Sequence, residues 1–501
     1  MHQAFTSKRR LCGVTVCVAA TVLLAACTLR APKESDPSAD PVRQTPLLEV
    51  FIAGSELPDP LNDDIKKALD AKLNIDLRIT ACLGDECKTQ LNMRTAVGNP
   101  PDIFYVDRRT LNRMAKQDQL LDLSPYIDLF KPAFDFVGGA KEHLTSVEGK
   151  QYGIALNNNA SQYTYWVRGD WLDTLGLKPP TNLDELAAVA QAITIRDPDG
   201  NGKNDTYGFS GAPNQALGPI FGAFGTTYPG HFYRKDGRLV NSLYDPGMKS
   251  ALAYIKALVD AGVVDPDFLS NTKVQHEVKA FQGQLGLFYY NWPNLINDNK
   301  VREWQQLNPN ARWTQLPTPQ GPGGAYTSFY DPGESNILVM PKTLGKSPYK
   351  LYKLIQLINY VSSPEGSRLA MYGIEGKHYT MSNGRIVPTA QMAQAKYSYM
   401  YQLTGRDELV YLQTKFAKQE PYFKFAMKQP RIEVLDSFIE PPPEYVPADT
   451  ERYITGELYK FLYGKRPLSS YDDFLMTLDH EYHYDIYLQA AEQQLKSQGL
   501  L

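Results

Sequence analysis

The sequence predicts an α/β protein with more than one lobe, and three observations lead to this fold class. Short apolar runs alternate with amphipathic helical segments, which is typical of a mainly parallel sheet flanked by helices on both faces. The chain has 501 residues, which is long for one hydrophobic core and suits two or three lobes. Its net charge is −3, and it has no basic block of the kind that binds nucleic acid.

The expected elements alternate along the chain. The apolar run 47–53 predicts a strand, and the segment 60–73 predicts an amphipathic helix. Thr181 is a candidate N-cap, because apolar residues recur at helical spacing from Leu183 to Ile193. Further strands are expected at 75–81, 101–106, 152–156, 281–290 and 335–340, and further helices at 89–96, 246–264, 350–361, 364–372 and 448–496, with an ordered Pro-rich loop at 429–448.

The first 27 residues are typical of a secretory signal peptide. Residues 8–10 are basic, and the uncharged apolar stretch 11–24 is too short to span a bilayer comfortably. Cys27 follows Leu-Ala-Ala, a pattern that resembles a bacterial lipobox, in which the cysteine is lipidated and becomes the mature N-terminus. We therefore expect residues 1–26 to be removed and Cys27 to anchor the protein, by palmitate, to the extracytoplasmic face of the cell membrane. The alternatives are a plain signal peptide cleaved near Ala26 or an N-terminal membrane anchor.

The next segment and the remaining cysteines fit this location. Residues 27–46 are rich in Pro, Ser, Asp and Lys and lack an apolar period, so we expect a flexible tether. Of the five cysteines, Cys82 and Cys87 remain after the signal peptide and the lipidated residue are set aside. A local pair in an oxidising compartment predicts a disulfide. A metal half-site is the alternative, but no second cluster of Cys or His completes it.

Several runs together resemble the extracellular solute-binding proteins of ABC importers, most of all the lipoprotein branch that includes alginate-binding proteins. The resemblance is carried by 165–177 (YWVRGDWLDTLGL), 180–186 (PTNLDEL), 283–286 (GQLG) with Trp292, and 372–379 (YGIEGKHY). It extends from the first predicted strand to the C-terminus. It implies two α/β lobes of the periplasmic-binding-protein type, joined by crossing strands and closing on a carbohydrate, as in the more distant maltose-binding proteins.

The resemblance also implies where the lobes divide. The N-lobe is expected to comprise residues 47–156 and 334–385. The C-lobe is expected to comprise residues 157–333 and 386–501.

An acidic loop in the expected C-lobe has the spacing of a calcium site. Carboxylate or amide oxygens recur at loop positions 1, 3, 5 and 9, a glycine stands at position 6, and a backbone carbonyl is available at position 7. The expected ligands of a structural Ca²⁺ are Asp197, Asp199, Asn201, the Lys203 carbonyl and Asp205. The alginate-binding relatives have an acid at the tenth position, where this chain has Thr206, so the sixth ligand is in doubt. The alternative is an Asp/Asn/Gly-rich turn that binds no ion.

Candidate ligand residues are aromatic and polar side chains near strand ends and lobe crossings, because a sugar presents apolar CH faces and a rim of hydroxyls. The resemblance places the aromatic Trp292 in the cleft. Each candidate also has a structural alternative, and for Trp166 the alternative of a core position is the stronger one. The expected ligand residues are Trp292, Glu375, Tyr379, Asp107, Asn158, Tyr163 and Trp166.

The expected function is therefore capture of an oligosaccharide between two lobes and delivery to an ABC permease, by a monomer that is not an enzyme. No nucleophile elbow, P-loop or HExxH run is present. His480 and His483, with Asp485 nearby, could bind a metal, but nothing in the sequence fixes a third ligand. The alternatives are a secreted polysaccharide-active enzyme, which would use two facing carboxylates, and a surface polymer-binding lipoprotein without a transport role.

Overall fold

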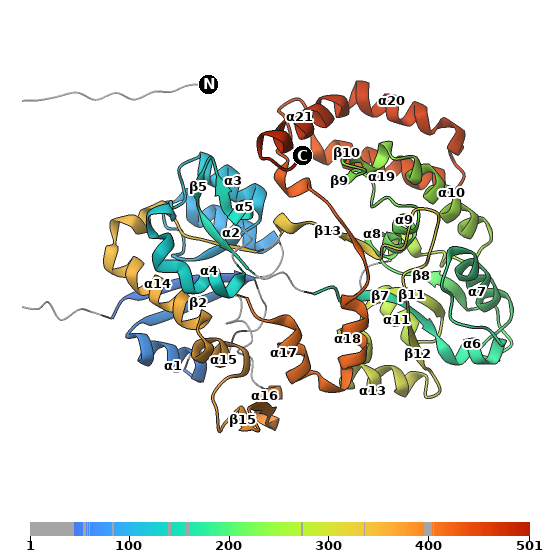
Figure 1. Ribbon diagram of the computed structural model, residues 1–501. Helices are drawn as coiled ribbons and strands as arrows, with labels where there is room; N and C mark the ends of the chain where they lie inside the picture. Colours follow the sequence, from blue (N-terminus) through green and yellow to red (C-terminus); the bar gives the residue numbers. More distant parts are fainter. Residues whose placement is uncertain are drawn as a thin grey trace, which may run out of the picture. The chain divides into compact units, whose positions relative to one another are not determined.

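The computed structural model describes most of the chain beyond residue 44 (Figure 1). Cys27, the expected signal peptide and most of the tether lie outside the described residues. Asn158 also lies outside them. Among the residues that are described, no helix is long and apolar enough to cross a membrane. The described residues are 45–53, 57, 59, 61–82, 85–138, 142–156, 160–271, 274–334, 336–394, 403 and 405–501.

The first lobe is built on a sheet whose strands come from three separate stretches of the chain. Its strands are β1 (Leu47–Ala53), β2 (Asp76–Cys82), β3 (Phe104–Val106), β6 (Gly153–Ala155) and β14 (Ile337–Val339). β1 runs parallel to β2, and a parallel bridge between Val50 and Ile103 places β3 beside β1. β14 lies antiparallel between β3 and β6, which gives the order β2-β1-β3-β14-β6.

The second lobe is built on a four-stranded sheet of order β12-β7-β11-β8. Its strands are β7 (Tyr163–Arg168), β8 (Tyr207–Ser210), β11 (Leu285–Asn291) and β12 (Trp313–Leu316). β7 runs antiparallel to both β11 and β12, whereas β8 runs parallel to β11. The α/β fold class is as expected, and the sheets are mixed, because one strand in each of them runs against the others. The exceptions, β7 and β14, are the strands that enter a lobe directly from a crossing, without the crossover helix that a parallel neighbour needs.

Helices cover both faces of the first sheet. They are α1 (Asp64–Leu73), α2 (Asp85–Ala96), α3 (Arg108–Lys116), α4 (Lys131–Val137), α5 (Glu142–Thr145), α14 (Pro348–Ser362) and α15 (Pro364–Tyr372). Helices α1, α4, α14 and α15 share a buried cluster with one face, which includes Val50 and Leu338. Helix α3 packs on the opposite face through Leu111. A disulfide between Cys82 and Cys87, with Cα atoms 5.2 Å apart, ties β2 to α2.

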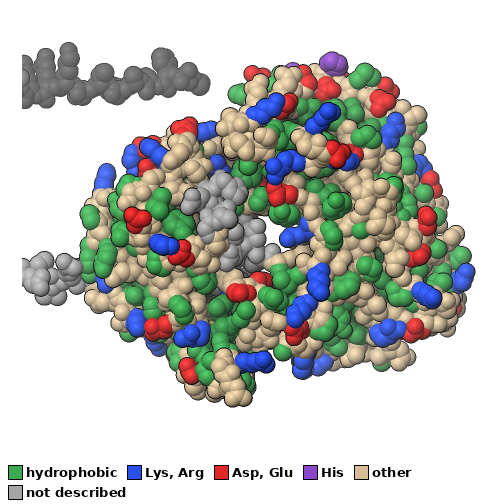
Figure 2. Space-filling model, in the orientation of Figure 1, with side chains coloured by type: hydrophobic (Ala, Val, Ile, Leu, Met, Phe, Trp, Pro, Cys, Tyr) green, Lys and Arg blue, Asp and Glu red, His purple; other side chains and the backbone are tan. Residues whose placement is uncertain are grey.

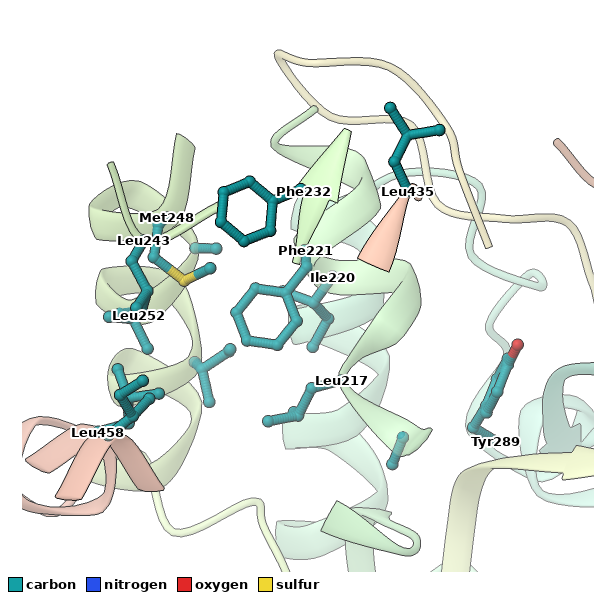
Figure 3. Close-up of a cluster of buried hydrophobic side chains, with 14 of the residues drawn as sticks. Leu217, Ile220, Phe221, Phe232, Leu243, Met248, Leu252, Tyr289, Leu435 and Leu458 are labelled. Carbon is teal, nitrogen blue, oxygen red and sulfur yellow. The ribbon is translucent and has the colours of Figure 1, made fainter. Parts of the chain in front are cut away.

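The second sheet is also buried on both faces, and every residue of β11 is buried. Tyr165 and Tyr289 pack among α6 to α10, part of which Figure 3 shows. Trp166 and Phe288 pack on the other face, with α11 to α13, α17 and α18. These helices are α6 (Gly169–Leu175), α7 (Leu183–Ile195), α8 (Pro213–Ala216), α9 (Gly218–Ala223), α10 (Pro246–Asp260), α11 (Gln275–Phe281), α12 (Pro293–Ile296), α13 (Asp298–Leu307), α17 (Glu408–Lys415) and α18 (Glu420–Met427).

The predicted helical tail is three helices: α19 (Pro447–Leu462), α20 (Tyr471–Glu481) and α21 (Tyr484–Ser497). It breaks at Pro467, which precedes a short 3-10 turn, and at His483, whose φ of 56° is left-handed. The tail packs on the second lobe, where the Tyr471 hydroxyl donates to the Leu243 carbonyl at 2.8 Å. The smaller elements are β4 (Ser146–Val147), β5 (Lys150–Gln151), β9 (Phe232–Lys235), β10 (Arg238–Asn241), β13 (Ser328–Tyr330), β15 (Tyr379–Ser382), β16 (Arg385–Pro388), β17 (Arg431–Glu433) and α16 (Ala390–Gln394).

The cap of α7 differs from the expectation. The Asn182 side chain accepts from the Glu185 N–H at 2.9 Å and caps the helix. Thr181 lies one residue earlier, and both its backbone N–H and its hydroxyl donate to the Glu185 carboxylate at 2.8 Å. These hydrogen bonds are typical of a helix N-terminus. The capping oxygen is that of the Asn182 amide, because Asn182 has an extended backbone and directly precedes the helix, within reach of the third helical N–H.

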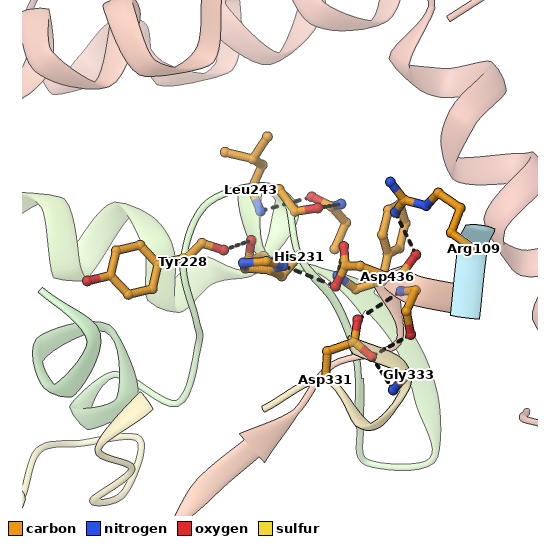
Figure 4. Close-up of polar contacts among 12 residues, drawn as sticks. Arg109, Tyr228, His231, Leu243, Asp331, Gly333 and Asp436 are labelled. Atoms are coloured by element: carbon orange, nitrogen blue, oxygen red, sulfur yellow. Dashed lines mark hydrogen bonds and ion pairs between the residues drawn. The ribbon is translucent and has the colours of Figure 1, made fainter. Parts of the chain in front are cut away.

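A polar cluster joins the segments that run between the lobes (Figure 4). Asp331, which follows β13, accepts from the backbone N–H groups of Gly333 and Ser437, each at 2.8 Å. Asp436 follows β17, and its carboxylate lies 3.0 Å from Nδ1 of His231. The Arg109 guanidinium, from α3 of the first lobe, donates to the Asp436 carbonyl at 2.9 Å. Residues from both lobes therefore meet here, at the segment that crosses from β13 to β14 and at the segment that follows β17.

His231 titrates among acidic groups. Burial by itself lowers the pKa of His231, but the charge and hydrogen bond of Asp436, with the charges of Glu334 and Asp331, raise it above its usual value. Burial raises the pKa of Asp331, and burial with the charge of Asp331 raises the pKa of Glu334. All three shifts make the folded protein bind protons more tightly than the unfolded chain. The stability from these protons is present at acidic pH and is lost as the pH rises.

Replacing His231 with Asn should remove the histidine's share of this dependence. The wild type should exceed His231→Asn in unfolding free energy by about 1 kcal/mol below the usual histidine pKa, because the ion pair with Asp436 is then complete. The difference should shrink as the pH rises through the raised pKa of His231. Denaturant unfolding across that range measures it, with His480→Asn at an exposed histidine as the baseline. A difference that grows with pH would contradict this account.

Candidate ligand-binding site

The site is built around a two-stranded ribbon at the lobe crossing, formed by β13 and β17 and here called the crossing ribbon. The strands run parallel, and Ser328 pairs with Arg431 and Tyr330 with Glu433. Because side chains alternate along a strand, these four residues share one face. All four are partly exposed. We call them the polar face of the crossing ribbon.

The polar face is held by contacts between its own members. The Tyr330 hydroxyl donates to a Glu433 carboxylate oxygen at 2.6 Å, and the other oxygen lies 3.4 Å from the Arg234 guanidinium. The Arg431 guanidinium lies over the Tyr330 ring, 4.9 Å from its centroid. The hydrogen bond to Glu433 and burial raise the pKa of Tyr330 to about 12, so its phenol stays protonated at neutral pH. The face thus presents a ring, a hydroxyl, a carboxylate and a guanidinium.

A pair of tyrosines from the second sheet adjoins the polar face. The rings of Tyr163 and Tyr289 are stacked, with centroids 5.5 Å apart. The Tyr289 hydroxyl lies 3.4 Å from Oγ1 of Thr327, the residue that precedes β13. Burial raises the pKa of Tyr289 to about 12. Tyr163 is partly exposed at the start of β7, so one aromatic ring beside the ribbon is accessible.

The opposite face of the ribbon is apolar and is packed against the second lobe. The Phe329 ring lies 4.3 Å from the His231 ring and 6.0 Å from the Tyr228 ring. The ribbon continues into β9, because Val434 bridges to Tyr233. This packing fixes which face of the ribbon is available for a ligand. The space-filling view shows a hollow in the middle of the molecule, with Lys and Arg side chains at its border (Figure 2).

Two of the residues predicted from sequence lie near this crossing. Tyr163 belongs to the tyrosine pair described above. Asp107 caps α3 and accepts from the Thr110 N–H at 2.7 Å, and its charge helps to raise the pKa of Glu334, for which burial is the larger cause. One oxygen of Asp107 is thus occupied within the first lobe.

The two tryptophans predicted as ligand residues are buried on the far face of the second sheet. Trp292 is 1% exposed, and the rings of Phe416 and Phe423 cover it at 5.5 and 5.7 Å. A sugar can reach it only if these rings move, so its ligand role stays a prediction. Trp166 is fully buried, and its indole N–H donates to the Tyr290 carbonyl at 3.0 Å, as expected of the core alternative.

The remaining predicted residues that the structure describes pack elsewhere than on the crossing ribbon. Tyr379 is 4% exposed and lies edge-on to Tyr372 in the third buried cluster. Glu375 is exposed in the turn before it and bridges to Tyr379 through the backbone. Asn158 lies outside the described residues. For these three, a role in ligand binding stays a prediction.

Sequence reasoning did not single out Arg431, Tyr330 or Tyr289. Arg431 and Tyr330 are about a hundred positions apart in sequence, and no motif links them. The only indication of Arg431 in the sequence was indirect: the stretch 429–448, which contains β17, was expected to be an ordered loop because it is rich in proline. Tyr289 belongs to a strand expected from its apolar character, and nothing in that pattern tells which end of the strand reaches the crossing.

The acidic loop folds around the Asn201 side chain. The Asn201 amide nitrogen donates to carboxylate oxygens of Asp199 at 2.8 Å and Asp205 at 3.1 Å. Asp197 instead accepts from the backbone N–H groups of Asn201 and Gly202, at 3.2 and 2.9 Å. In the part of the chain that the structure describes, no group of three or more His, Cys, Asp or Glu residues is placed to hold a metal ion.

Thr206, at the position expected for the sixth calcium ligand, does not point into the loop. Thr206 is 2% exposed, and its hydroxyl donates to the Ile193 carbonyl at 2.9 Å. The side chain therefore serves the end of α7 and is turned away from the loop. The pKa of Asp199 is raised by burial, and the neighbouring Asp197 and Asp205 add to that shift, so the acidic groups of the loop repel one another as they stand.

Comparison with known proteins finds one matching family and several similar binding proteins. The family described as bacterial extracellular solute-binding protein matches residues 65–394. The polygalacturonan/rhamnogalacturonan-binding protein YtcQ of Bacillus subtilis is 27% identical over 328 residues, which is 64% of this chain and 64% of the relative. The chain thus spans somewhat less than two thirds of that relative. Lipoprotein LipO of the same organism is 24% identical over 379 residues, 73% of each chain.

The fold has counterparts among solved structures. The crystal structure of the alginate-binding protein AlgQ2 without calcium ion matches with a TM-score of 0.65 and 16% identity, over 91% of this chain and 98% of that one. At this identity the likeness concerns the fold, two lobes of mixed α/β structure. Since the family match covers more than half of the sequence, the chain belongs to the bacterial extracellular solute-binding proteins.

Proposed function

We propose that this protein is a lipid-anchored extracytoplasmic receptor that binds an oligosaccharide between its two lobes and delivers it to an ABC importer. The observation that carries the proposal is the polar face of the crossing ribbon, in a chain of the solute-binding family. The matching family is described by its binding of solutes. The names of YtcQ and AlgQ2 refer to polysaccharide ligands, which supports a carbohydrate as the solute.

The chemistry of the crossing suits a sugar. A tyrosine ring can pack against the CH face of a pyranose, and Tyr163 and Tyr330 are partly exposed. Ser328, Glu433 and Arg431 can exchange hydrogen bonds with hydroxyl groups. A sugar that contacts both lobes would favour their closed arrangement by its differential affinity for that state.

Removing an aromatic platform should weaken sugar binding. Tyr163→Ala and Tyr330→Ala should each lower the affinity at least tenfold, about 1.4 kcal/mol, because the stacking area is lost. Calorimetric titration with a panel of oligosaccharides measures this, and Tyr352→Ala, on an exposed tyrosine of α14, is the matched control.

The same panel tests the alternatives. If no oligosaccharide gives heat or changes the small-angle scattering radius, the receptor proposal fails. If the panel is cleaved, a polysaccharide-active enzyme takes its place. If only long polymers bind and the radius stays constant, a surface polymer-binding lipoprotein without a transport role is the better account.

We also propose that the acidic loop binds one structural Ca²⁺. Asp197, Asp199, Asn201, the Lys203 carbonyl and Asp205 supply hard oxygen ligands at the required spacing. The Asn201 amide nitrogen now lies between carboxylates of Asp199 and Asp205, and turning this amide would offer its oxygen to a cation instead. The ion would neutralise carboxylates that otherwise repel. The similar structure of AlgQ2 is described as lacking its calcium ion, which indicates that AlgQ2 can bind calcium and supports the idea for this chain.

Calcium removal should destabilise the protein. A chelator should lower the melting temperature, since an ion that binds only the folded state stabilises it by about 2.7 kcal/mol at a hundredfold excess over its dissociation constant. Asp197→Ala should abolish the chelator effect, whereas Asp472→Ala, at a largely exposed aspartate, should leave it intact. Identical melting curves with and without chelator would count against the site.

The N-terminal anchor gives a further prediction. Because Cys27 follows a lipobox-like sequence, mass spectrometry of the mature protein should find it as the N-terminal residue carrying lipid. Cys27→Ser should release the protein from the membrane fraction. An intact Met1, or a Cys27 with free amine and thiol, would refute the lipoprotein assignment.

A further inference from the structure

We propose that the ligand of the crossing ribbon is an acidic oligosaccharide and that Arg431 binds a uronate carboxylate. The inference rests on the proposed function and adds the chemical class of the sugar. It comes from the charge of Arg431 on the polar face, which no carboxylate matches among the described residues.

Arg431 is partly buried but has no acidic partner. In the part of the chain that the structure describes, its guanidinium forms no ion pair, and its contact with a side chain is the Tyr330 ring at 4.9 Å. Burial lowers the pKa of Arg431, and the charges that oppose this belong to the phenols of Tyr330 and Tyr289. Taking a charge out of water without a carboxylate is costly, so the site favours an anion that arrives with the ligand.

Other sheltered arginines of the chain show what is missing. Arg168 is paired with Asp170 at 2.5 Å, Arg406 with Glu408 at 2.5 Å, and Arg466 with Glu457 at 2.5 Å. Each of these guanidinium groups has its carboxylate nearby in sequence. Arg108 also forms no ion pair among the described residues, but it is 5% exposed and donates to the Ser146 carbonyl at 2.9 Å. Arg431 differs in being partly exposed, without an ion pair, on a face that it shares with ring and hydroxyl groups.

The acid on the same face does not supply the partner. Glu433 lies two residues after Arg431, but its oxygens are taken by the Tyr330 hydroxyl at 2.6 Å and by Arg234 at 3.4 Å. The carboxylates of Asp331 and Asp436 belong to the polar cluster around His231, where backbone N–H groups and the imidazole hold them. A carboxylate that arrives with the ligand matches the planar fork of a guanidinium with two parallel hydrogen bonds, which a sugar hydroxyl cannot do.

The arrangement predicts how a uronate would bind. A pyranose packed on the ring of Tyr330 or Tyr163 carries its carboxylate at the edge of the sugar ring. Arg431 stacks on Tyr330, so its free N–H groups lie close to that edge. The same residues thus provide a platform for the CH face and a cation for the acid group.

Calorimetric titration with matched ligands tests this. The ligands are galacturonate and mannuronate trimers and the same trimers with every carboxylate reduced to a primary alcohol, which keeps size and linkage constant. The wild type should bind at least one acidic trimer ten or more times more tightly than its reduced form. Arg431→Gln should lower the affinity for that acid by about tenfold to a hundredfold and change the affinity for the reduced trimer by less than about threefold.

Control variants separate charge from folding. Arg431→Lys keeps the charge but loses the fork, and its affinity for the acidic trimer should fall between those of the wild type and Arg431→Gln. Arg452→Gln removes a largely exposed arginine of α19 and should leave the preference unchanged. The comparison of acidic and reduced trimers on the wild type needs no variant, so it decides the question even if a substitution impairs folding.

The outcomes distinguish this inference from the function beneath it. If the wild type binds reduced or other neutral oligosaccharides as tightly as acidic ones, the uronate assignment is overturned and the sugar receptor stands. If the acid is preferred but Arg431→Gln weakens both trimers equally, Arg431 is not the residue that recognises the carboxylate. If neither kind of oligosaccharide binds, the receptor proposal itself fails, and this inference fails with it.

Discussion

The carboxylate of Asp331 holds together the segments on which the candidate site depends. It follows β13 and accepts N–H groups from its own turn and from Ser437, which follows β17. These bonds fix how β13 and β17 run side by side, and the parallel register then places Ser328, Tyr330, Arg431 and Glu433 on one face. Because an unsatisfied buried carboxylate is costly, this constraint is strong. The ligand-binding chemistry proposed here follows from the alignment of these strands.

Burial explains why a partly open polar face is found at the crossing. Both main sheets are covered on their two faces by helices, so the aromatic residues of their strands serve packing. Trp166 and Trp292 illustrate this, since each is almost fully buried beside other rings. The crossing ribbon has only two strands and one packed face, through Phe329. Its other face can hold polar side chains without the cost of burying them.

The acidic loop and the His231 cluster show two ways to accommodate negative charge. Around His231, the carboxylates are satisfied by backbone N–H groups and by the imidazole. In the loop 197–205, an asparagine amide and backbone N–H groups take that role. The first arrangement uses donors contributed by distant segments, and the second is local. Because the second arrangement is local, its pattern of oxygen-bearing side chains can be read from the sequence.

The sequence by itself determined features that depend on neighbouring residues. The strand Leu47–Ala53 and the helix Pro364–Tyr372 fall where their apolar patterns predict, and Cys82 pairs with Cys87 because they are five positions apart. The family resemblance supplied the two-lobed fold. Only the tertiary structure decided the mixed strand directions, the burial of Trp292, and the meeting of Tyr330 with Arg431. Local periodicity records which face of an element is apolar, but it does not record which distant segment will pack there, and the unpaired charge of Arg431 exists only once the strands have met.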